Sequence, residues 1–420
     1  MSATAERGAE LRQIDAGAGA YRLTMPLATL TCALAPAYTV RWHVGFYPTT
    51  ALEAGILLTL VAFAWESWRL RRVPVWRSPF TVAAMLLVIA GAVSVVVAPD
   101  RRAALGLFRA YFIEPVLFFV VLITVIRTSR QAFMMVAGLA AGGTVVALLN
   151  IATVVDALRH HAVDTGQNAP VAIYQTSNAV ALFLVPIIAV AGSLLLYSRS
   201  PRQRQLAALF VALGAIAVVF SFSRGGYAAL FAVGIGLALS HRRRWWMLGG
   251  LALLVVVATR VPIIASRLAH QINMTDPSNT LAGRIHLWQV TLNMMREHLV
   301  FGTGLSGYAH FMTPWPNGLV QVIYPHNLVL NFWVATGVLG LVAFVVLLVQ
   351  AFRTAWRGWI TTDVDWRPFQ LGVLLALVSI VVHGLVDVPY FKNDLSFEFW
   401  VLLAISWAGT LKSRPLLRNA

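Results

Sequence analysis

Long apolar runs, separated by short polar segments, follow one another along almost the whole chain. The runs have roughly the 20 residues that an α-helix needs to cross the hydrocarbon core of a bilayer. The expected spans are residues 25–40, 47–68, 79–97, 111–126, 132–155, 176–197, 205–222, 226–240, 245–259, 326–350, 368–386 and 395–410. The pattern therefore predicts an all-α fold, a polytopic transmembrane helical bundle of about 12 spans.

Arginine and lysine concentrate in alternate loops, which indicates the loops that stay in the cytoplasm. The first 20 residues lack the apolar core of a signal peptide and are interpreted as a polar cytoplasmic tail, with the first span as an anchor. The expected cytoplasmic segments are this tail, residues 69–77, 127–130, 199–204, 241–244 and 353–367, and the chain from Lys412 onward. Both termini are then cytoplasmic.

Composition excludes a soluble fold. Apolar residues make up 59% of the 420 positions and charged residues 11%, whereas soluble domains carry about 25% charged residues. The net charge of +16 is assigned to topology, not to nucleic acid, because no basic run is interleaved with aromatic residues on a soluble segment. The single cysteine, Cys32, allows no intrachain disulfide.

One loop, residues 260–325, is too long to be a simple connector. Within it, one helix face is predicted from the 3, 4, 3, 4 spacing of Ile285, Trp288, Leu292, Met295 and Leu299. We expect this amphipathic helix to lie against the membrane, and the loop to be extracytoplasmic and to carry the function. Without internal repeats or a soluble insertion, residues 1–420 are predicted to form a single membrane domain.

Two arginines occupy positions that favour an anionic ligand. Arg224, in Ser223-Arg224-Gly225-Gly226, falls between two spans with almost no loop, so it is held at the outer membrane surface, where it either faces a polar cavity or extends to the headgroups. Arg284 follows the possible capping residues 278–280 and is expected in the first helical turn. A helix N-terminus repels a cation but attracts phosphate, so Arg284 is either an anion ligand or a solvated loop residue.

A histidine is expected on the same side. His326, in Tyr324-Pro325-His326-Asn327, is placed in the first turn of the next span, because proline suits a helix start. The helix dipole and a neighbouring arginine would keep it neutral and able to accept a proton, although an interfacial structural role is the alternative. Two arginines and a neutral histidine at headgroup level suit chemistry on a lipid-linked diphosphate, and such a site requires no metal.

Other polar residues indicate a function less specifically. Residues 302–307 match G-x-G-x-x-G, but without a preceding strand they are interpreted as a flexible turn. Asp387, four residues after His383, is expected to form a structural pair with it or to contact the site. The carboxylates Glu53, Glu66 and Glu114 are either interfacial or proton-coupling groups.

Several motifs in the same order resemble the O-antigen ligase and O-antigen polymerase superfamily over roughly residues 205–345. They are Ser223-Arg224-Gly225-Gly226, the element from Arg284 to Trp288 that leads through Met294 and Met295 to Phe301-Gly302-Thr303-Gly304, and Pro325-His326-Asn327 before Gly337-Val338-Leu339-Gly340. The sequence from His383 to Asp387 is similar to the last loop of that family.

The resemblance implies a metal-independent, inverting glycosyltransferase of the GT-C type in the bacterial inner membrane, without a cofactor and with its active site facing the periplasm. Its donor would be an undecaprenyl-diphosphate-linked glycan, with Arg224 and Arg284 on the diphosphate and His326 activating the acceptor hydroxyl. We expect Tyr324, Trp288, Asn327 and Asp387 as supporting contacts. Whether Arg101, Arg102 and Arg109 assist donor binding is left open.

The motifs leave the acceptor open. Ligases of this superfamily glycosylate the lipid A core, polymerases extend another repeat unit, and a third branch glycosylates proteins. A ligase is favoured because the chain is compact and has one dominant outer loop. A transporter that captures an anionic lipid or solute is a more remote alternative, because neither internal repeats nor polar groups at the midplane are evident. A non-catalytic scaffold would need no ordered base.

Overall fold

The structure, a computed structural model, describes residues 21–160, 169–260, 279–312 and 322–412. Its helices are α2 (Thr24–Ala33), α3 (Ala51–Arg69), α4 (Thr81–Val97), α5 (Arg101–Phe108), α6 (Glu114–Val125), α7 (Ser129–Arg159), α8 (Asn178–Tyr197), α9 (Pro201–Phe220), α10 (Arg224–Ser240), α11 (Arg244–Ala258), α13 (Thr280–Met295), α14 (Tyr308–Phe311), α15 (Leu328–Thr361), α16 (Arg367–Gly384) and α17 (Asn393–Lys412). A 3₁₀ helix η1 (Ala35–Thr39), a π-helical turn η2 (Arg109–Ile113) and the strands β1 (Arg41–Val44) and β2 (Tyr47–Thr50) complete the described elements.

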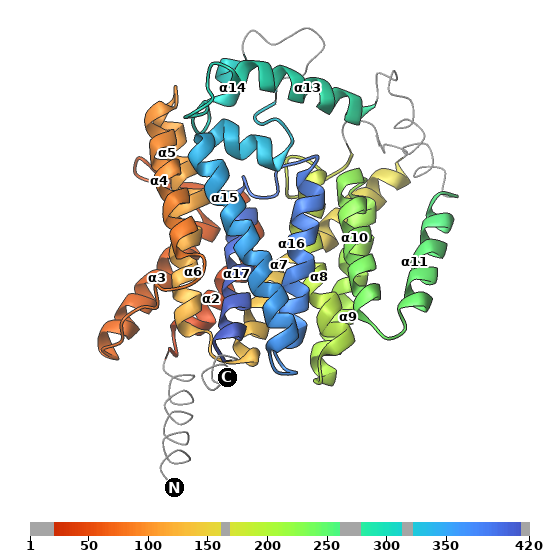
Figure 1. The fold of residues 1–420 in the computed structure, drawn as a ribbon. Helices are drawn as coiled ribbons and strands as arrows, with labels where there is room; N and C mark the ends of the chain where they lie inside the picture. The colour runs from red at the N-terminus through yellow and green to blue at the C-terminus, as the bar shows by residue number, and fades with distance from the viewer. Residues whose placement is uncertain (1–20, 161–168, 261–278, 313–321, 413–420) are drawn as a thin grey trace.

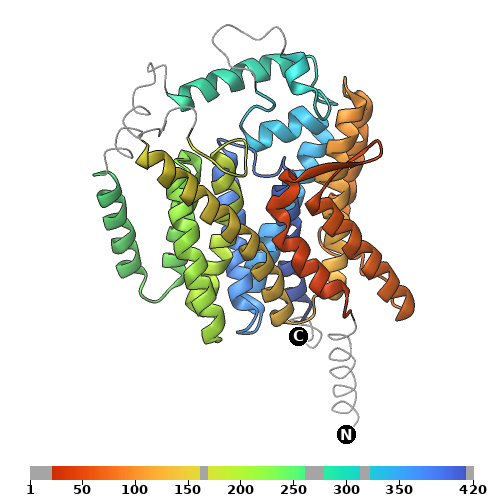
Figure 2. The same cartoon turned by 180° about the vertical axis from the view of Figure 1, so that it is seen from behind.

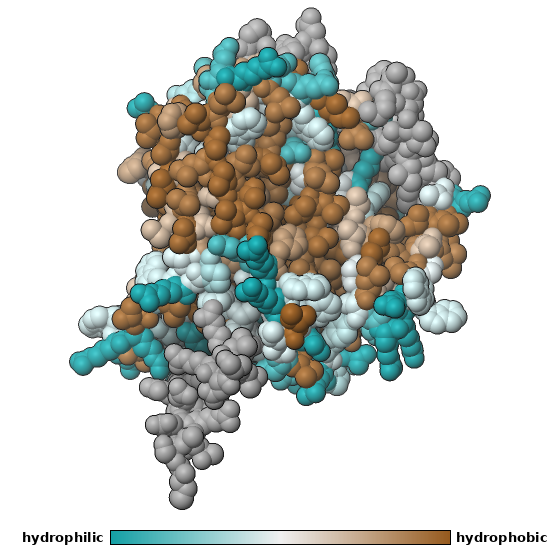
Figure 3. All heavy atoms as spheres, in the orientation of Figure 1, coloured by the Kyte–Doolittle hydropathy of each residue, from teal (hydrophilic) through white to brown (hydrophobic). Residues whose placement is uncertain are grey.

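The predicted transmembrane helical bundle is present. Among the described residues, 8 helices are long and apolar enough to cross a membrane, the α5–η2–α6 run counting as one, while α4, α10 and α11 are shorter apolar helices. Figure 3 shows a broad apolar band between two more polar ends, as expected for a multi-pass membrane protein. The predicted number of about 12 spans is not established by these helices.

The first predicted span, residues 25–40, is wrong in its outer half. Helix α2 ends at Ala33, and the chain continues through η1, in which Pro36 occupies an early position where its missing N–H is tolerated. An antiparallel hairpin of β1 and β2 follows, with Gly45 at φ +60 in its turn. Apolar residues within η1 and at Val40 explain why the apolar run extended the expected span beyond Ala33.

Helices α8, α16 and α17 form the centre of the bundle, and their side chains are almost entirely buried. Helix α16 packs closely on α8, because a Cβ added at Gly372 would lie 2.6 Å from Val190 Cα. Near the start of α15, Phe332 stacks on Phe344 with ring centroids 3.8 Å apart, and Phe332 also contacts Tyr390. This aromatic cluster fixes the start of α15 against the turn between α16 and α17.

Helix α15 is broken at Gly337, whose φ of 67° and ψ of −171° are not helical. The preceding segment, residues 328–336, is therefore set at an angle to the long remainder of α15 (Figure 1). The motif from Phe301 to Gly304 fills this break: Thr303 N donates to Val334 O at 2.7 Å, and Val338 N donates to Val300 O at 3.0 Å. Residues 302–307, which the sequence indicated to be a flexible turn, thus belong to an ordered segment, here called the strap, that connects α13 to the break in α15.

Helix α13 lies across one end of the bundle, above α15 and α16, in both ribbon views (Figures 1 and 2). It was predicted correctly, but its buried face differs from the expected stripe. Met295 is buried as predicted, whereas Leu292 and Leu299 are 48% and 50% exposed. Leu287 and Thr291 are buried instead. The spacing of apolar residues could not identify Thr291 as buried, because threonine is polar and its buried hydroxyl is satisfied by a hydrogen bond with the Tyr308 hydroxyl at 2.8 Å.

Candidate functional site

Asp387 is the centre of a cluster of polar side chains beneath α13. It lies in the turn between α16 and α17 and its side chain is 3% exposed. Its Oδ1 is 3.3 Å from His326 Nδ1 and accepts a hydrogen bond from Val388 N at 2.9 Å. Its Oδ2 accepts from Asn178 Nδ2 at 3.1 Å and lies 3.9 Å from a terminal nitrogen of Arg284. One carboxylate therefore contacts both a candidate base and a candidate anion ligand.

The charge of Asp387 is well stabilised. Burial alone would raise the pKa of this carboxyl, but the hydrogen bond and charge of His326 and the charge of Arg284 outweigh burial and hold the pKa below its usual range. Asp387 is thus ionised throughout the neutral range. As an acceptor it favours a proton on His326 Nδ1, which leaves the lone pair on Nε2.

His326 does not lie in the first helical turn, which corrects the prediction. It has φ +52 and precedes α15, which is capped by Asn327. The Asn327 side chain accepts from Leu330 N at 3.0 Å and donates to Leu385 O at 3.1 Å, which ties the helix start to the turn that carries Asp387. The expected position in the first helical turn is thus replaced by a contact with the Asp387 carboxylate.

Arg284 is positioned by the start of α13. Asn279 caps this helix by accepting from Leu281 N and Ala282 N, so Arg284 begins the second turn, not the predicted first. Its side chain is 20% exposed. Burial lowers the pKa of Arg284, and Asp387 opposes that shift. A guanidinium in this position stays charged and can present its remaining donors to an anion.

Arg224 is the first residue of α10, capped by Ser223, whose hydroxyl accepts from Gly226 N at 3.2 Å. One terminal nitrogen of Arg224 donates to Thr280 Oγ1 at 2.5 Å, and Arg224 is close enough to Arg284 for their positive charges to interact. Its Nε is buried without a hydrogen-bond partner among the described residues. Two guanidiniums and one unused buried donor therefore face the same region.

The two glycines after Arg224 allow close helix packing. A Cβ at Gly225 would lie 2.7 Å from a ring carbon of His383, and one at Gly226 would lie 2.4 Å from the Ala181 Cβ. Because any larger residue would push α10 away from α8 and α16, these glycines determine where Arg224 stands relative to the Asp387 cluster.

The remaining predicted contacts also come together. Trp288 Nε1 donates to Pro325 O at 2.9 Å, which joins α13 to the segment immediately before His326. The rings of Tyr324 and His326 pack edge to face with centroids 5.0 Å apart. Burial, Asp387 and Tyr111 raise the pKa of Tyr324, so its hydroxyl stays protonated. The only site contacts that sequence reasoning missed among these are Asn178 and Thr280.

The other charged residues considered from the sequence lie outside the Asp387 cluster. Arg109 is held by Glu53 at 2.9 Å and by Glu114 at 2.9 Å, so it is committed to a separate ion cluster at η2. Glu66 accepts three hydrogen bonds from residues 23–24. Arg101 and Arg102 are exposed at the start of α5.

Comparison with known proteins identifies one region of the chain. Residues 207–345, which run from α9 through Arg224, α13, the strap and His326 into α15, match a family model described as O-Antigen ligase. A search of curated proteins finds no match.

Proposed function

Because the chain carries an O-antigen ligase region at residues 207–345, which confirms the resemblance to that superfamily, we propose that it transfers a glycan from a lipid-linked diphosphate to an acceptor hydroxyl. The observation that carries the proposal is the contact of Asp387 with both His326 and Arg284. A base and an anion ligand that share one carboxylate are held at a fixed separation, as transfer from a diphosphate leaving group requires.

The charges suit a diphosphate donor. Arg224 and Arg284 carry two positive charges, of which Asp387 balances one, so an anion is needed to neutralise the remainder. The unpartnered Nε of Arg224 supplies a further buried donor. Guanidinium groups bind phosphate through parallel hydrogen bonds and stabilise the charge that develops on the leaving diphosphate. We therefore propose a reaction that needs no metal ion.

The proposed step conserves atoms and charge as follows. The acceptor oxygen attacks the anomeric carbon of the donor glycan, and its proton passes to Nε2 of His326. The bond between the anomeric carbon and the diphosphate oxygen breaks on the opposite face, so the configuration inverts. The bond electrons leave with the undecaprenyl diphosphate held by Arg224 and Arg284. Asp387 stabilises the imidazolium that forms.

We propose the lipid A core as acceptor, with a second glycan repeat unit or a protein as the alternatives within the superfamily. We further propose that the protein resides in the bacterial inner membrane with both termini in the cytoplasm, which places the α13 end in the periplasm. Support comes from the arginine-rich loops at the opposite end of the bundle, such as residues 69–77 and 199–204.

The test is transfer by purified protein in nanodiscs with an undecaprenyl-diphosphate glycan, lipid A core and EDTA. We expect single transfer to lipid A core, with at least about a 10²-fold loss in His326→Ala because a general base contributes that much. Lengthening of the donor glycan would identify a polymerase instead. If His326→Ala transferred as fast as wild type, or no acceptor were glycosylated, the proposed chemistry would be refuted and donor movement across the membrane would be measured next.

A further inference from the structure

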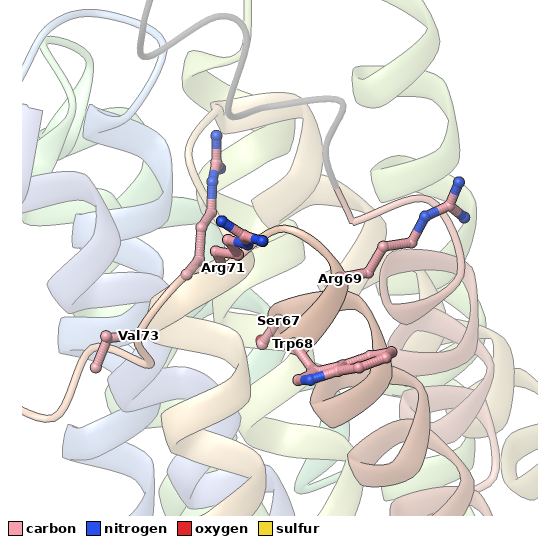
Figure 4. A pocket seen from close by; sticks show the side chains of 6 residues that line it. Ser67, Trp68, Arg69, Arg71 and Val73 are labelled. Carbon is pink, nitrogen blue, oxygen red and sulfur yellow. The ribbon is translucent and has the colours of Figure 1, made fainter.

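A hollow in the described part of the chain lies far from the Asp387 cluster, at the end of α3 opposite α13. It has a volume of about 550 Å³ and is open to one side. Its lining residues are Ser67, Trp68, Arg69, Arg71, Arg72 and Val73 (Figure 4). Pockets that hold small organic groups have volumes of roughly 300–1,000 Å³, so the hollow is large enough for a lipid headgroup.

The backbone folds so that three arginines line one hollow. Helix α3 ends with Arg71 N donating to Trp68 O at 3.1 Å and Arg72 N donating to Ser67 O at 2.9 Å. The reversal places Arg71 at φ +52, a left-handed conformation that usually belongs to glycine at a helix end. A positively charged loop does not need an arginine in a strained backbone conformation. The strained Arg71 beside two other arginines therefore indicates a specific role for this group.

The positive charges have no counterion among the described residues. Glu66, the carboxylate that most closely precedes the three arginines in the chain, already accepts hydrogen bonds from Leu23 N at 2.8 Å and from the Thr24 amide and hydroxyl at 2.9 and 2.7 Å. Arg127 adds a further positive charge that interacts with Arg72. The negative end of the α3 dipole amounts to about half a charge, which three arginines exceed.

Aromatic residues indicate that the hollow lies at headgroup level. Trp68 and Trp65 are 73% and 52% exposed, and their ring centroids are 5.5 Å apart. Exposed tryptophans on a transmembrane helix gather at the boundary between hydrocarbon and water. The arginines extend beyond this pair, toward the depth at which lipid phosphates lie.

We propose that this hollow binds the phosphate of an anionic phospholipid headgroup, with the forks of Arg69, Arg71 and Arg72 on the phosphate oxygens and Trp68 against the glycerol and upper acyl chain. The site is independent of the proposed glycan transfer, since it lies at the other end of the bundle. Its ligand would be a lipid of the leaflet expected to face the cytoplasm, such as phosphatidylglycerol.

The experiment is native mass spectrometry of the full chain released from detergent after titration with phosphatidylglycerol or phosphatidylcholine. Wild type is expected to keep a phosphatidylglycerol adduct and to bind phosphatidylcholine at least tenfold more weakly, since each arginine at a membrane surface contributes several-fold to the affinity for an anionic lipid. Equal binding of the two lipids to wild type would overturn the proposal without any variant.

Variants locate the site. Arg69→Gln/Arg71→Gln/Arg72→Gln is expected to weaken phosphatidylglycerol binding roughly 100-fold. The matched control is Arg199→Gln/Arg202→Gln/Arg204→Gln, which removes the same charge from the segment just before α9 and from its first turn, and it is expected to bind like wild type. If both triple variants lost the adduct to the same extent, binding would reflect net charge and the proposed site would be refuted.

Discussion

Replacing Asp387 by asparagine tests whether this carboxylate positions the proposed base. The substitution keeps the size of the side chain but removes the charge that lies 3.3 Å from His326 and 3.9 Å from Arg284. Val388 N and His326 Nδ1 contact the same oxygen, Oδ1, so the carbonyl oxygen of asparagine can keep both contacts, while its amide places a donor on the side of Asn178 and Arg284, where the carboxylate had an acceptor. We expect the imidazolium that forms on His326 to lose its stabilising negative charge, which slows transfer.

The size of the effect follows from these contacts. In a Ser-His-Asp triad the equivalent substitution lowers the rate by about 10⁴. His326 is 23% exposed and its contact with Asp387 is long, so water can replace part of the orientation and we expect a loss of about 10² to 10³. Stability should also fall, because Arg284 loses its counterion. Breaking a buried pair costs about 3–5 kcal/mol, which partial exposure of Arg284 reduces to about 2–3 kcal/mol.

A double-mutant cycle separates positioning from stability. Transfer rate and thermal unfolding in nanodiscs are measured for Asp387→Asn in wild type and in His326→Ala. If Asp387 acts through His326, the rate loss should nearly vanish in the second background while the loss of stability persists. Asp394→Asn is the matched control, since Asp394 is also buried and accepts from Tyr174 at 2.9 Å. Equal rate losses in both backgrounds would refute the role given to Asp387.

Three further predictions follow from the same geometry. Gly337→Ala should destabilise the protein by about 2–4 kcal/mol in thermal unfolding, because its conformation belongs to glycine and the new Cβ would lie 2.2 Å from Val300 O. Gly225→Ala should reduce transfer at least tenfold by displacing Arg224 from the site, measured as an increased KM for the donor. Lowering the pH from 8 to 5 should not weaken the contribution of Asp387 to the free energy of unfolding, because folding depresses the pKa of this carboxyl, as pH–unfolding profiles of wild type and Asp387→Asn can show.

The sign of the last prediction depends on Asp387. Its pKa is depressed on folding, so its contribution to stability is complete above the unfolded pKa of about 3.9 and is lost only as pH falls through the lower folded value. Between pH 5 and 8 the difference in unfolding free energy between wild type and Asp387→Asn should therefore stay constant. A difference that shrinks between pH 8 and pH 5 would contradict a depressed pKa for this carboxyl. For both glycine variants Gly249→Ala is the control, because a Cβ there meets nothing within 4 Å.

Apolar run length predicted the helices well where the chain continues without interruption. Helices α7 to α11 lie where the spans were expected, because their ends carry arginine, serine or proline signals. The pattern failed where apolar residues leave the helix. Residues 35–39, which form η1, and the break at Gly337 both lie within expected spans, and at Gly337 a φ of +67° distinguishes the break from helix.

Only the residues that belong to sequence motifs could be predicted for the site. Arg224, Arg284 and His326 stood out as charged or titratable residues at span ends. Asn178 could not be recognised, because its hydrogen bond to Asp387 joins residues 209 positions apart and nothing local marks it. The backbone of His326 was also beyond sequence reasoning, since a proline before it suggested a helix start that is in fact delayed to Leu328.

The strap and the glycines explain why such a site can be assembled from distant segments. Arg284 stands on α13, so its position depends on how the contacts between this helix and the bundle are fixed. Trp288 ties the helix to Pro325, and the strap that follows α13 is hydrogen-bonded into the break of α15. The same break orients the segment that begins beside His326. A single glycine conformation therefore sets the distance between the proposed anion ligand and the proposed base, which makes Gly337 a positioning residue for transfer as well as a determinant of stability.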